Sequence, residues 1–168
     1  MPQVEFAALP AHARLWVFAA ESPLTGAPAD ELLSHVDAFV RSWKAHGAPL
    51  TAARDWRYDR FLLIGVDERA AGVSGCSVDA LTHTLRELQG TLGMNLLETA
   101  PVFYRDGDTI RRANRSEFKA RADRGEVDAS TVVFDNTVET VGALLRWETP
   151  AGASWHAKAF PLKRAATR

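Results

Sequence analysis

Residues 50–66 read LTAARDWRYDRFLLIGV, and this stretch decides the fold. It contains two strand patterns, residues 50–58 and 60–66, joined by a tight turn near Asp59. The run FLLI at residues 61–64 is apolar throughout, which is typical of a strand that is buried on both faces. We therefore expect a β-hairpin whose second strand is central in a sheet.

Further strands and helices alternate around this hairpin. The run LWVF at residues 15–18 predicts a buried strand before it, and residues 101–105 predict a strand after it. One helix is expected from Pro28 to Gly47, and another over about residues 77–92, because apolar residues recur at helical spacing. The two apolar faces comprise Leu32, Val36, Phe39, Val40 and Trp43, and Val78, Leu81, Leu85, Leu88 and Leu92.

This order of elements predicts an α+β protein with a ferredoxin-like core. Strand, helix, strand, strand, helix, strand is the βαββαβ order of the split βαβ fold, a two-layer sandwich. We assign this core to residues 1–105. Residues 106–168 are expected to form a small α/β extension that packs on the core.

Composition excludes several classes of function. The chain has 168 residues and a net charge of −1, so the basic excess that is typical of nucleic-acid binding is absent. The single cysteine excludes an intrachain disulfide and favours a reducing compartment. We find no signal-peptide pattern and no apolar stretch long enough to span a membrane, so we expect a cytoplasmic protein.

Motifs for cofactors and metals are also missing. The sequence lacks the phosphate-binding loop Gly-x4-Gly-Lys-Ser/Thr and the dinucleotide fingerprint Gly-x-Gly-x-x-Gly. It has no Cys-x-x-Cys, no His-x-x-x-His and no His-Glu-x-x-His. We therefore expect no metal and no cofactor.

The segment GVSGCSVD at residues 72–79 leads into the second helix and carries the only cysteine, Cys76. Free N–H groups at a helix start favour a thiolate and can also bind an anion, so Gly75, Ser77 and Asp79 are candidate ligand-binding residues. Asp79 and Asp67 would add negative charge, which disfavours both uses. The alternative interpretation is a small buried residue that closes a strand–loop–helix corner.

A thiol enzyme also needs a base, and two histidines are candidates. His156 lies in the aromatic segment SWH, where it could activate Cys76 or hydrogen-bond a backbone carbonyl in a structural loop. His46 precedes Gly47 and could serve the same role, although capping of the helix end by a cation explains it equally well.

Trp56 and Tyr58 are two residues apart, so they would share one face of the predicted strand. Such a pair can bind a small or anionic ligand, or be covered by a helix or by the second subunit of a homodimer. We therefore carry two hypotheses. The first is a non-catalytic binding or regulatory domain that dimerises through an exposed sheet face, and the alternative is a small thiol-dependent enzyme with Cys76 as nucleophile.

Several short stretches carry a resemblance to a known family. They are residues 43–48, 60–62, 66–68, 74–79, 117–119, 131–136 and 154–156, reading WKAHGA, RFL, VDE, SGCSVD, EFK, TVVFDN and SWH. Together they resemble a family of uncharacterised bacterial proteins of similar length, whose members are often labelled ABC-transporter ATPases. The missing phosphate-binding loop argues against that activity here. The resemblance implies a shared fold and no established function.

Overall fold

The structure, a computed structural model, describes residues 4–165 and is an α+β fold that divides into two compact units. Unit 1 comprises residues 1–98 and 138–143, and unit 2 comprises residues 99–137 and 144–168. The first boundary lies between residues 98 and 99, so the strand at residues 102–106 belongs to unit 2 and not to the predicted core of residues 1–105. Within residues 4–165, none of the helices combines the length and apolar character needed to cross a membrane.

Unit 1 contains a three-stranded sheet in the order β1-β5-β4. β1 (Arg14–Ala19) and β4 (Thr51–Arg57) both run antiparallel to β5 (Phe61–Asp67), which lies between them. Every residue of β5 is buried, so the prediction that the run at residues 61–64 forms a central strand is confirmed. A three-residue turn that includes Tyr58 and Asp59, both at positive φ, joins β4 to β5.

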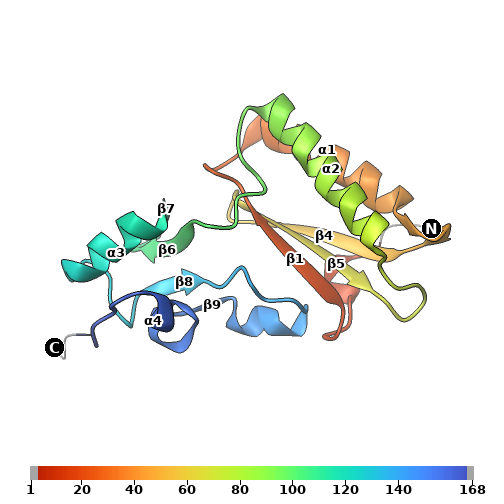
Figure 1. Cartoon of the computed structure of the whole chain (residues 1–168). Coiled ribbons are helices and arrows are strands. Elements are labelled where there is room, and N and C mark those ends of the chain that lie inside the picture. The colour runs from red at the N-terminus through yellow and green to blue at the C-terminus, as the bar shows by residue number, and fades with distance from the viewer. Residues whose placement is uncertain (1–3, 166–168) are drawn as a thin grey trace. The chain divides into compact units, whose positions relative to one another are not determined.

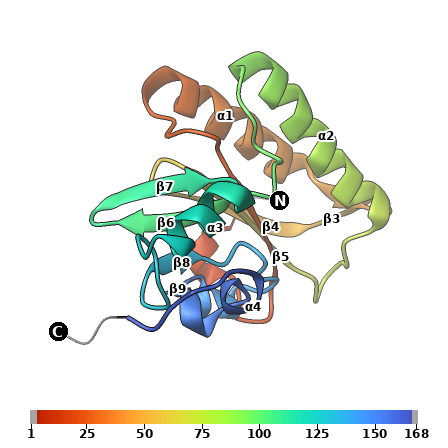
Figure 2. The same ribbon diagram turned by 60° about the vertical axis from the view of Figure 1, so that its left-hand side comes forward.

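Two long helices cover one face of this sheet. Figures 1 and 2 both show α1 (Gly26–Ser42) and α2 (Gly75–Leu92) side by side on the same side of the strands. Side chains alternate along β5, so Leu62, Ile64 and Val66 point toward the helices and join their apolar faces in one core. On the opposite face, Leu9 packs with Ala13 and Ala53, beside the short helix η1 (Phe6–Ala8).

The ferredoxin-like topology is not confirmed, because the strand order does not match. A fourth strand, expected at residues 101–105, would have to pair within the sheet of β1, β4 and β5. Instead β6 (Val102–Asp106) pairs with two strands of unit 2. The structure thus supports the coarser class, α+β, and unit 1 has a sheet of three strands among the described residues.

Unit 2 is built on a four-stranded antiparallel sheet in the order β7-β6-β8-β9. Its other strands and helices are β7 (Thr109–Ala113), α3 (Arg115–Asp123), β8 (Val132–Phe134), β9 (Glu148–Pro150) and α4 (His156–Ala159), with the 3-10 turn η3 (Ala151–Ala153). A second 3-10 turn, η2 (Gly142–Arg146), crosses the boundary between the two units. The core contains Phe118 of α3, which packs edge to face against Tyr104 and Phe160. Unit 2 therefore has a small core that combines aromatic rings with small aliphatic side chains.

Candidate functional site

The start of α2 carries several of the candidate residues, including Cys76, and the structure shows where this helix begins and how it is capped. The helix begins at Gly75, two residues before the expected start, and Ser74 is its N-cap. The Ser74 hydroxyl accepts a hydrogen bond from the Ser77 N–H at 3.2 Å, and the Ser77 hydroxyl accepts one from the Ser74 N–H at 2.7 Å. This reciprocal pair is a capping box, which satisfies two of the backbone donors at the helix start.

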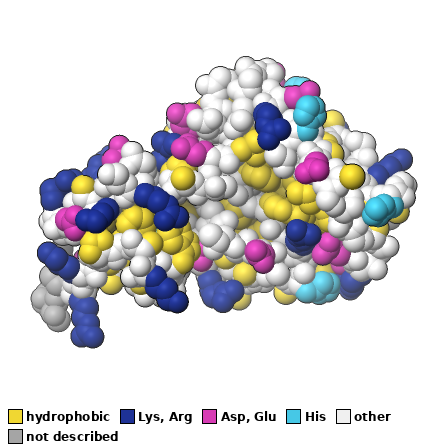
Figure 3. Space-filling model, viewed as in Figure 1, with side chains coloured by type: hydrophobic (Ala, Val, Ile, Leu, Met, Phe, Trp, Pro, Cys, Tyr) yellow, Lys and Arg dark blue, Asp and Glu magenta, His cyan; other side chains and the backbone are white. Residues whose placement is uncertain are grey.

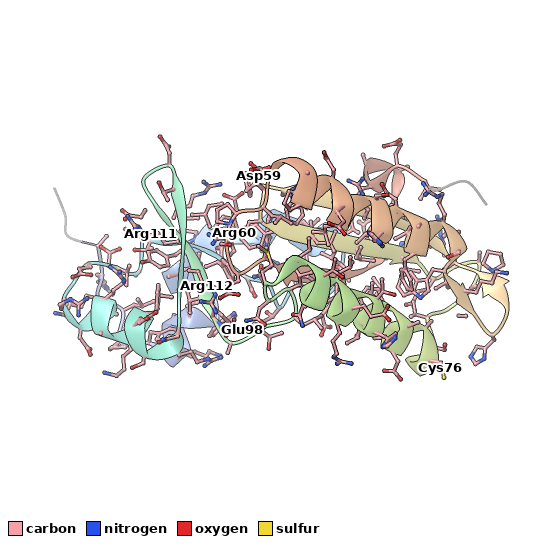
Figure 4. The ribbon with its side chains drawn as sticks, turned by 90° about the horizontal axis from the view of Figure 1, so that it is seen from above. Asp59, Arg60, Cys76, Glu98, Arg111 and Arg112 are labelled. Carbon is pink, nitrogen blue, oxygen red and sulfur yellow. The ribbon has the colours of Figure 1, made fainter. Side chains whose placement is uncertain are left out.

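Cys76 is exposed in the first turn of α2, so it is not the buried corner residue of the alternative interpretation. Figure 4 shows it at the end of unit 1 opposite the turn that carries Asp59 and Arg60. Gly75 and Asp79 are exposed beside it, whereas Ser77 is buried. The Ser77 carbonyl accepts a hydrogen bond from the Trp43 indole N–H at 2.9 Å, so Ser77 ties α2 to the end of α1.

One of the two acidic residues expected near Cys76, Asp67, is paired with an arginine. Asp67 ends β5, and its carboxylate lies 2.5 Å from the Arg69 guanidinium. The hydrogen bonds from Arg69 lower the pKa of Asp67 to about 2, and His12 adds a weaker electrostatic contribution. Asp67 therefore stays ionised at neutral pH with its charge compensated by Arg69.

His46 does not cap a helix, because α1 already ends at Ser42. Residues 44–49 form a small hairpin of β2 (Lys44–Ala45) and β3 (Ala48–Pro49), with His46 and Gly47 as its two-residue turn. Both turn residues have positive φ, as a type I′ turn requires. β2 packs beside α2, but no hydrogen bond or ion pair joins the exposed His46 to Cys76 among residues 4–165.

His156 belongs to unit 2, whereas Cys76 belongs to unit 1. The imidazole is 1 % exposed, stacks on Trp155 at 3.8 Å, and has Nδ1 2.7 Å from the Ser154 hydroxyl. Burial lowers the pKa of His156 to about 4, so the ring is neutral at pH 7. These surroundings fit a structural histidine in an aromatic core, and the pairing with Cys76 stays a prediction.

Trp56 and Tyr58 do not form the predicted stripe. β4 ends at Arg57, so Tyr58 lies in the turn at a φ of 58° and not on the strand. Trp56 pairs with Leu62 of β5 and packs into the core under the helices. Neighbouring Arg54 also reaches this helix-covered side and forms a two-pronged ion pair with Asp37 of α1, with both distances 2.7 Å. The structure therefore does not support a ligand-binding or dimerisation surface formed by Trp56 and Tyr58 on one face of a strand.

The outer edge of β1 is a feature that the sequence analysis missed. Backbone hydrogen bonds along β1 alternate between β5 and the outer side, and residues 15, 17 and 19 face outward. Residues 139–141 pair with residues 13–15 on the outer side, where the Leu15 N–H donates to the Glu139 carbonyl at 2.9 Å. Just after the strand, the Glu21 N–H donates to the Asn95 carbonyl at 3.0 Å. Among residues 4–165, the N–H and carbonyl groups of Val17 have no hydrogen-bond partner.

The side chains along this edge are apolar and incompletely covered. Trp16, Val17 and Phe18 are all half-buried, and Trp16 and Phe18 adjoin the core on the helix side. Figure 3 shows hydrophobic side chains gathered over β1 and beside α2. Nothing in the run LWVF distinguishes an edge strand from a central one, because that depends on which strands pair across the fold.

No protein-family model, curated protein or solved structure matches this chain.

Proposed function

We propose that this protein is a non-catalytic binding domain whose first unit accepts an extended segment of a partner as an added strand on β1. The observation that carries the proposal is the unpaired backbone of Val17 at a half-buried, apolar edge. An added strand would satisfy these backbone groups, and side chains on its two faces would contact β1 alternately.

A comparison of the two edges of the sheet supports β1 as the binding edge. Natural proteins protect edge strands against unwanted pairing with charged residues, prolines or bulges. β4, the other edge, carries Arg54, Asp55 and Arg57 in its last four residues. β1 has one charged residue, Arg14, at its first position and none from Leu15 to Ala19. Between the segments of the chain that pair at residues 13–15 and at Glu21, the β1 edge is therefore the less protected of the two.

The test is binding of a labelled peptide of sequence ARLWVFAA, a copy of residues 13–20, measured by fluorescence anisotropy. Val17→Pro removes the outward N–H without breaking a bond to β5, so it should abolish binding and leave the unit folded. Val17→Thr is the matched control, because it keeps the N–H and the branched shape and should still bind. Absence of binding by the wild type, or equal binding by Val17→Pro, would contradict the proposal.

A second candidate function rests on the exposure of Cys76 in the first turn of α2. In this alternative Cys76 is the nucleophile of a thiol-dependent enzyme, with His46 or His156 as its base. The helix start would lower the thiol pKa and speed alkylation at neutral pH. The rate of Cys76 alkylation by iodoacetamide, followed against pH, tests this. A midpoint near the ordinary thiol pKa of about 8.5 would count against it.

A further inference from the structure

Charge is divided unequally between the two units of the chain. Unit 2 has twelve Lys and Arg against eight Asp and Glu, and unit 1 has eight against thirteen. Their formal net charges are therefore +4 and −5, although the whole chain carries −1. Figure 3 shows Lys and Arg side chains spread over the elements of unit 2. The basic excess that the whole chain lacks is thus present in one of its units.

Part of the positive charge of unit 2 is neutralised within the unit, and part is not. Ion pairs of 2.6–3.0 Å join Arg105 to Glu148, Arg111 to Asp106, Lys119 to Asp123, and both Arg121 and Arg124 to Glu126. Within residues 4–165, the exposed cations of unit 2 that form no ion pair are Arg115, Arg146, Lys158, Lys163 and Arg164. These side chains can accept an anion from outside the chain.

Four of these cations lie on or beside α4. The Arg115 guanidinium, at the start of α3, lies 5.1 Å from the centroid of the Trp155 ring. The Lys158 N–H donates to the Trp155 carbonyl at 3.0 Å, so Lys158 is one turn further along the chain. The segment after α4 carries the other two, and it is fixed to unit 2 by a hydrogen bond of 2.9 Å from the Ala129 N–H to the Lys163 carbonyl. The cationic surface of unit 2 therefore consists of Arg115, Lys158, Lys163 and Arg164.

We infer that this cationic surface binds the phosphate backbone of duplex DNA without reading its base sequence. Lys and Arg side chains that neutralise phosphates release counterions, and this contribution to affinity does not depend on sequence. A duplex carries more charge per unit length than a single strand, so it is the stronger ligand for a surface that acts by charge alone. Single-strand sites add aromatic rings on which bases stack. The described residues of unit 2 expose no aromatic ring, and the half-buried Trp155 already stacks on His156.

A protein or a membrane fits this surface less well than a nucleic acid does. Protein interfaces are anchored by aromatic and other large side chains, and membrane attachment needs apolar side chains that enter the lipid. In the described part of unit 2, Leu145 is the one large apolar side chain that is exposed, and it belongs to η2 and not to the cationic surface. The surface offers charge without apolar anchors, which suits the regularly spaced phosphates of a duplex.

Fluorescence anisotropy of a labelled duplex of about 20 base pairs, titrated with the full chain at several salt concentrations, tests the inference. If four phosphates are neutralised, log K should fall against log salt with a slope of about −3.6, which is a loss of about 150-fold between 50 and 200 mM salt. The triple variant Arg115→Gln/Lys158→Gln/Lys163→Gln should bring the slope to about −1 and weaken binding by at least about 30-fold at 50 mM salt.

The matched control removes the same charge from unit 1. Arg41, Lys44 and Arg86 are exposed and form no ion pair among residues 4–165. Arg41→Gln/Lys44→Gln/Arg86→Gln should therefore keep the salt slope of the wild type and change the Kd by less than about threefold. Equal weakening by the two triple variants would overturn the inference, because net charge and not the cationic surface would then control binding.

Three further results would overturn the inference. The first is a wild type that does not bind the duplex at 50 mM salt. The second is tighter binding of the single strand than of the duplex. The third is displacement of the duplex by polyglutamate or by vesicles of anionic phospholipid at lower concentration than by unlabelled duplex, which would assign the surface to another partner. Val17→Pro should bind the duplex as the wild type does, since the cationic surface does not involve β1.

Discussion

The two units of this chain are stabilised in different ways. Unit 1 buries mainly aliphatic side chains between a three-stranded sheet and two helices of 17 and 18 residues. Unit 2 has short helices of nine and four residues, and its core combines valine and alanine side chains with the rings of Tyr104, Phe118 and Phe160, against which His156 packs. Unit 1 therefore derives its stability from many aliphatic contacts, whereas unit 2 depends on a smaller core that contains several rings and one buried titratable group.

This difference makes unit 2 more sensitive to single changes and to pH. The loss of one aromatic ring removes a large share of a small core, while a long amphipathic helix distributes its contacts over several turns. A buried neutral histidine also costs free energy when it must take up a proton. Amide hydrogen exchange can measure this difference, because it reports on the two units separately.

The largest effect is expected from Phe118→Ala in unit 2. Phe118 is fully buried, and its ring lies 4.8 Å from Phe160 and 5.4 Å from Tyr104. Truncation should lower the free energy of unfolding of unit 2 by about 3–5 kcal/mol, because it removes a ring and leaves a cavity. Amides of unit 2 should lose protection while those of α2 keep theirs.

Leu145→Ala is the matched control, since Leu145 belongs to unit 2 but is 93 % exposed. It should change the unfolding free energy by less than about 0.5 kcal/mol. Equal loss of protection in both units of the Phe118→Ala variant would mean that they unfold as one cooperative body, and the contrast between them would not hold.

A smaller effect is expected from acidification, through His156. Its pKa is about 4 in the folded protein, chiefly because burial disfavours the charged ring, with Arg115 adding to the depression and Asp135 opposing it. The ordinary histidine pKa is about 6.5 in the unfolded chain. The stabilisation is therefore complete above pH 6.5 and is lost as the pH falls from 6.5 through 4, by up to about 3 kcal/mol.

The measurement is the difference in unit 2 protection between the wild type and His156→Gln at pH 7 and at pH 4.5. Glutamine does not titrate in this range, so the variant should lose less stability on acidification than the wild type, although it starts lower. Unit 1 amides should respond alike in the two proteins. A wild type and variant with parallel pH profiles would contradict the assigned role of His156.

The sequence predicted local structure well and long-range pairing poorly. Helix periodicity placed α2 within two residues of its observed start, and the apolar run of β5 identified the central strand. A strand at residues 101–105 was also expected, but the expected pairing with the sheet of β1, β4 and β5 was wrong. Strand pairing depends on contacts between residues far apart in the chain, which local patterns do not reveal. A continuous apolar run such as FLLI, at residues 61–64, shows that a strand is buried and says nothing about its neighbours.

The candidate site was less predictable for the same reason. Cys76 was expected just before a helix that begins at about residue 77, and it lies in the first turn because the helix begins two residues earlier, at Gly75. Trp56 and Tyr58 were expected on one strand, but the strand ends between them at Arg57 and the chain turns at positive φ. The open edge at Val17 follows only from the strand order, which no local pattern of residues encodes.

The smallest effect is expected from Gly65→Ala, which tests the packing of unit 1 on the face away from the helices. A Cβ at Gly65 would overlap Cδ1 of Leu9, which is the flexible end of a side chain, and would lie 3.4 Å from the Phe6 ring. Movement of Leu9 should relieve the overlap, so we expect a loss of about 1 kcal/mol in unit 1 and none in unit 2. Leu9→Ala should make the Gly65→Ala change nearly neutral, because it removes the atom that clashes. A double-mutant cycle by urea unfolding measures this coupling, and additive losses would show that the strain lies in β5 itself.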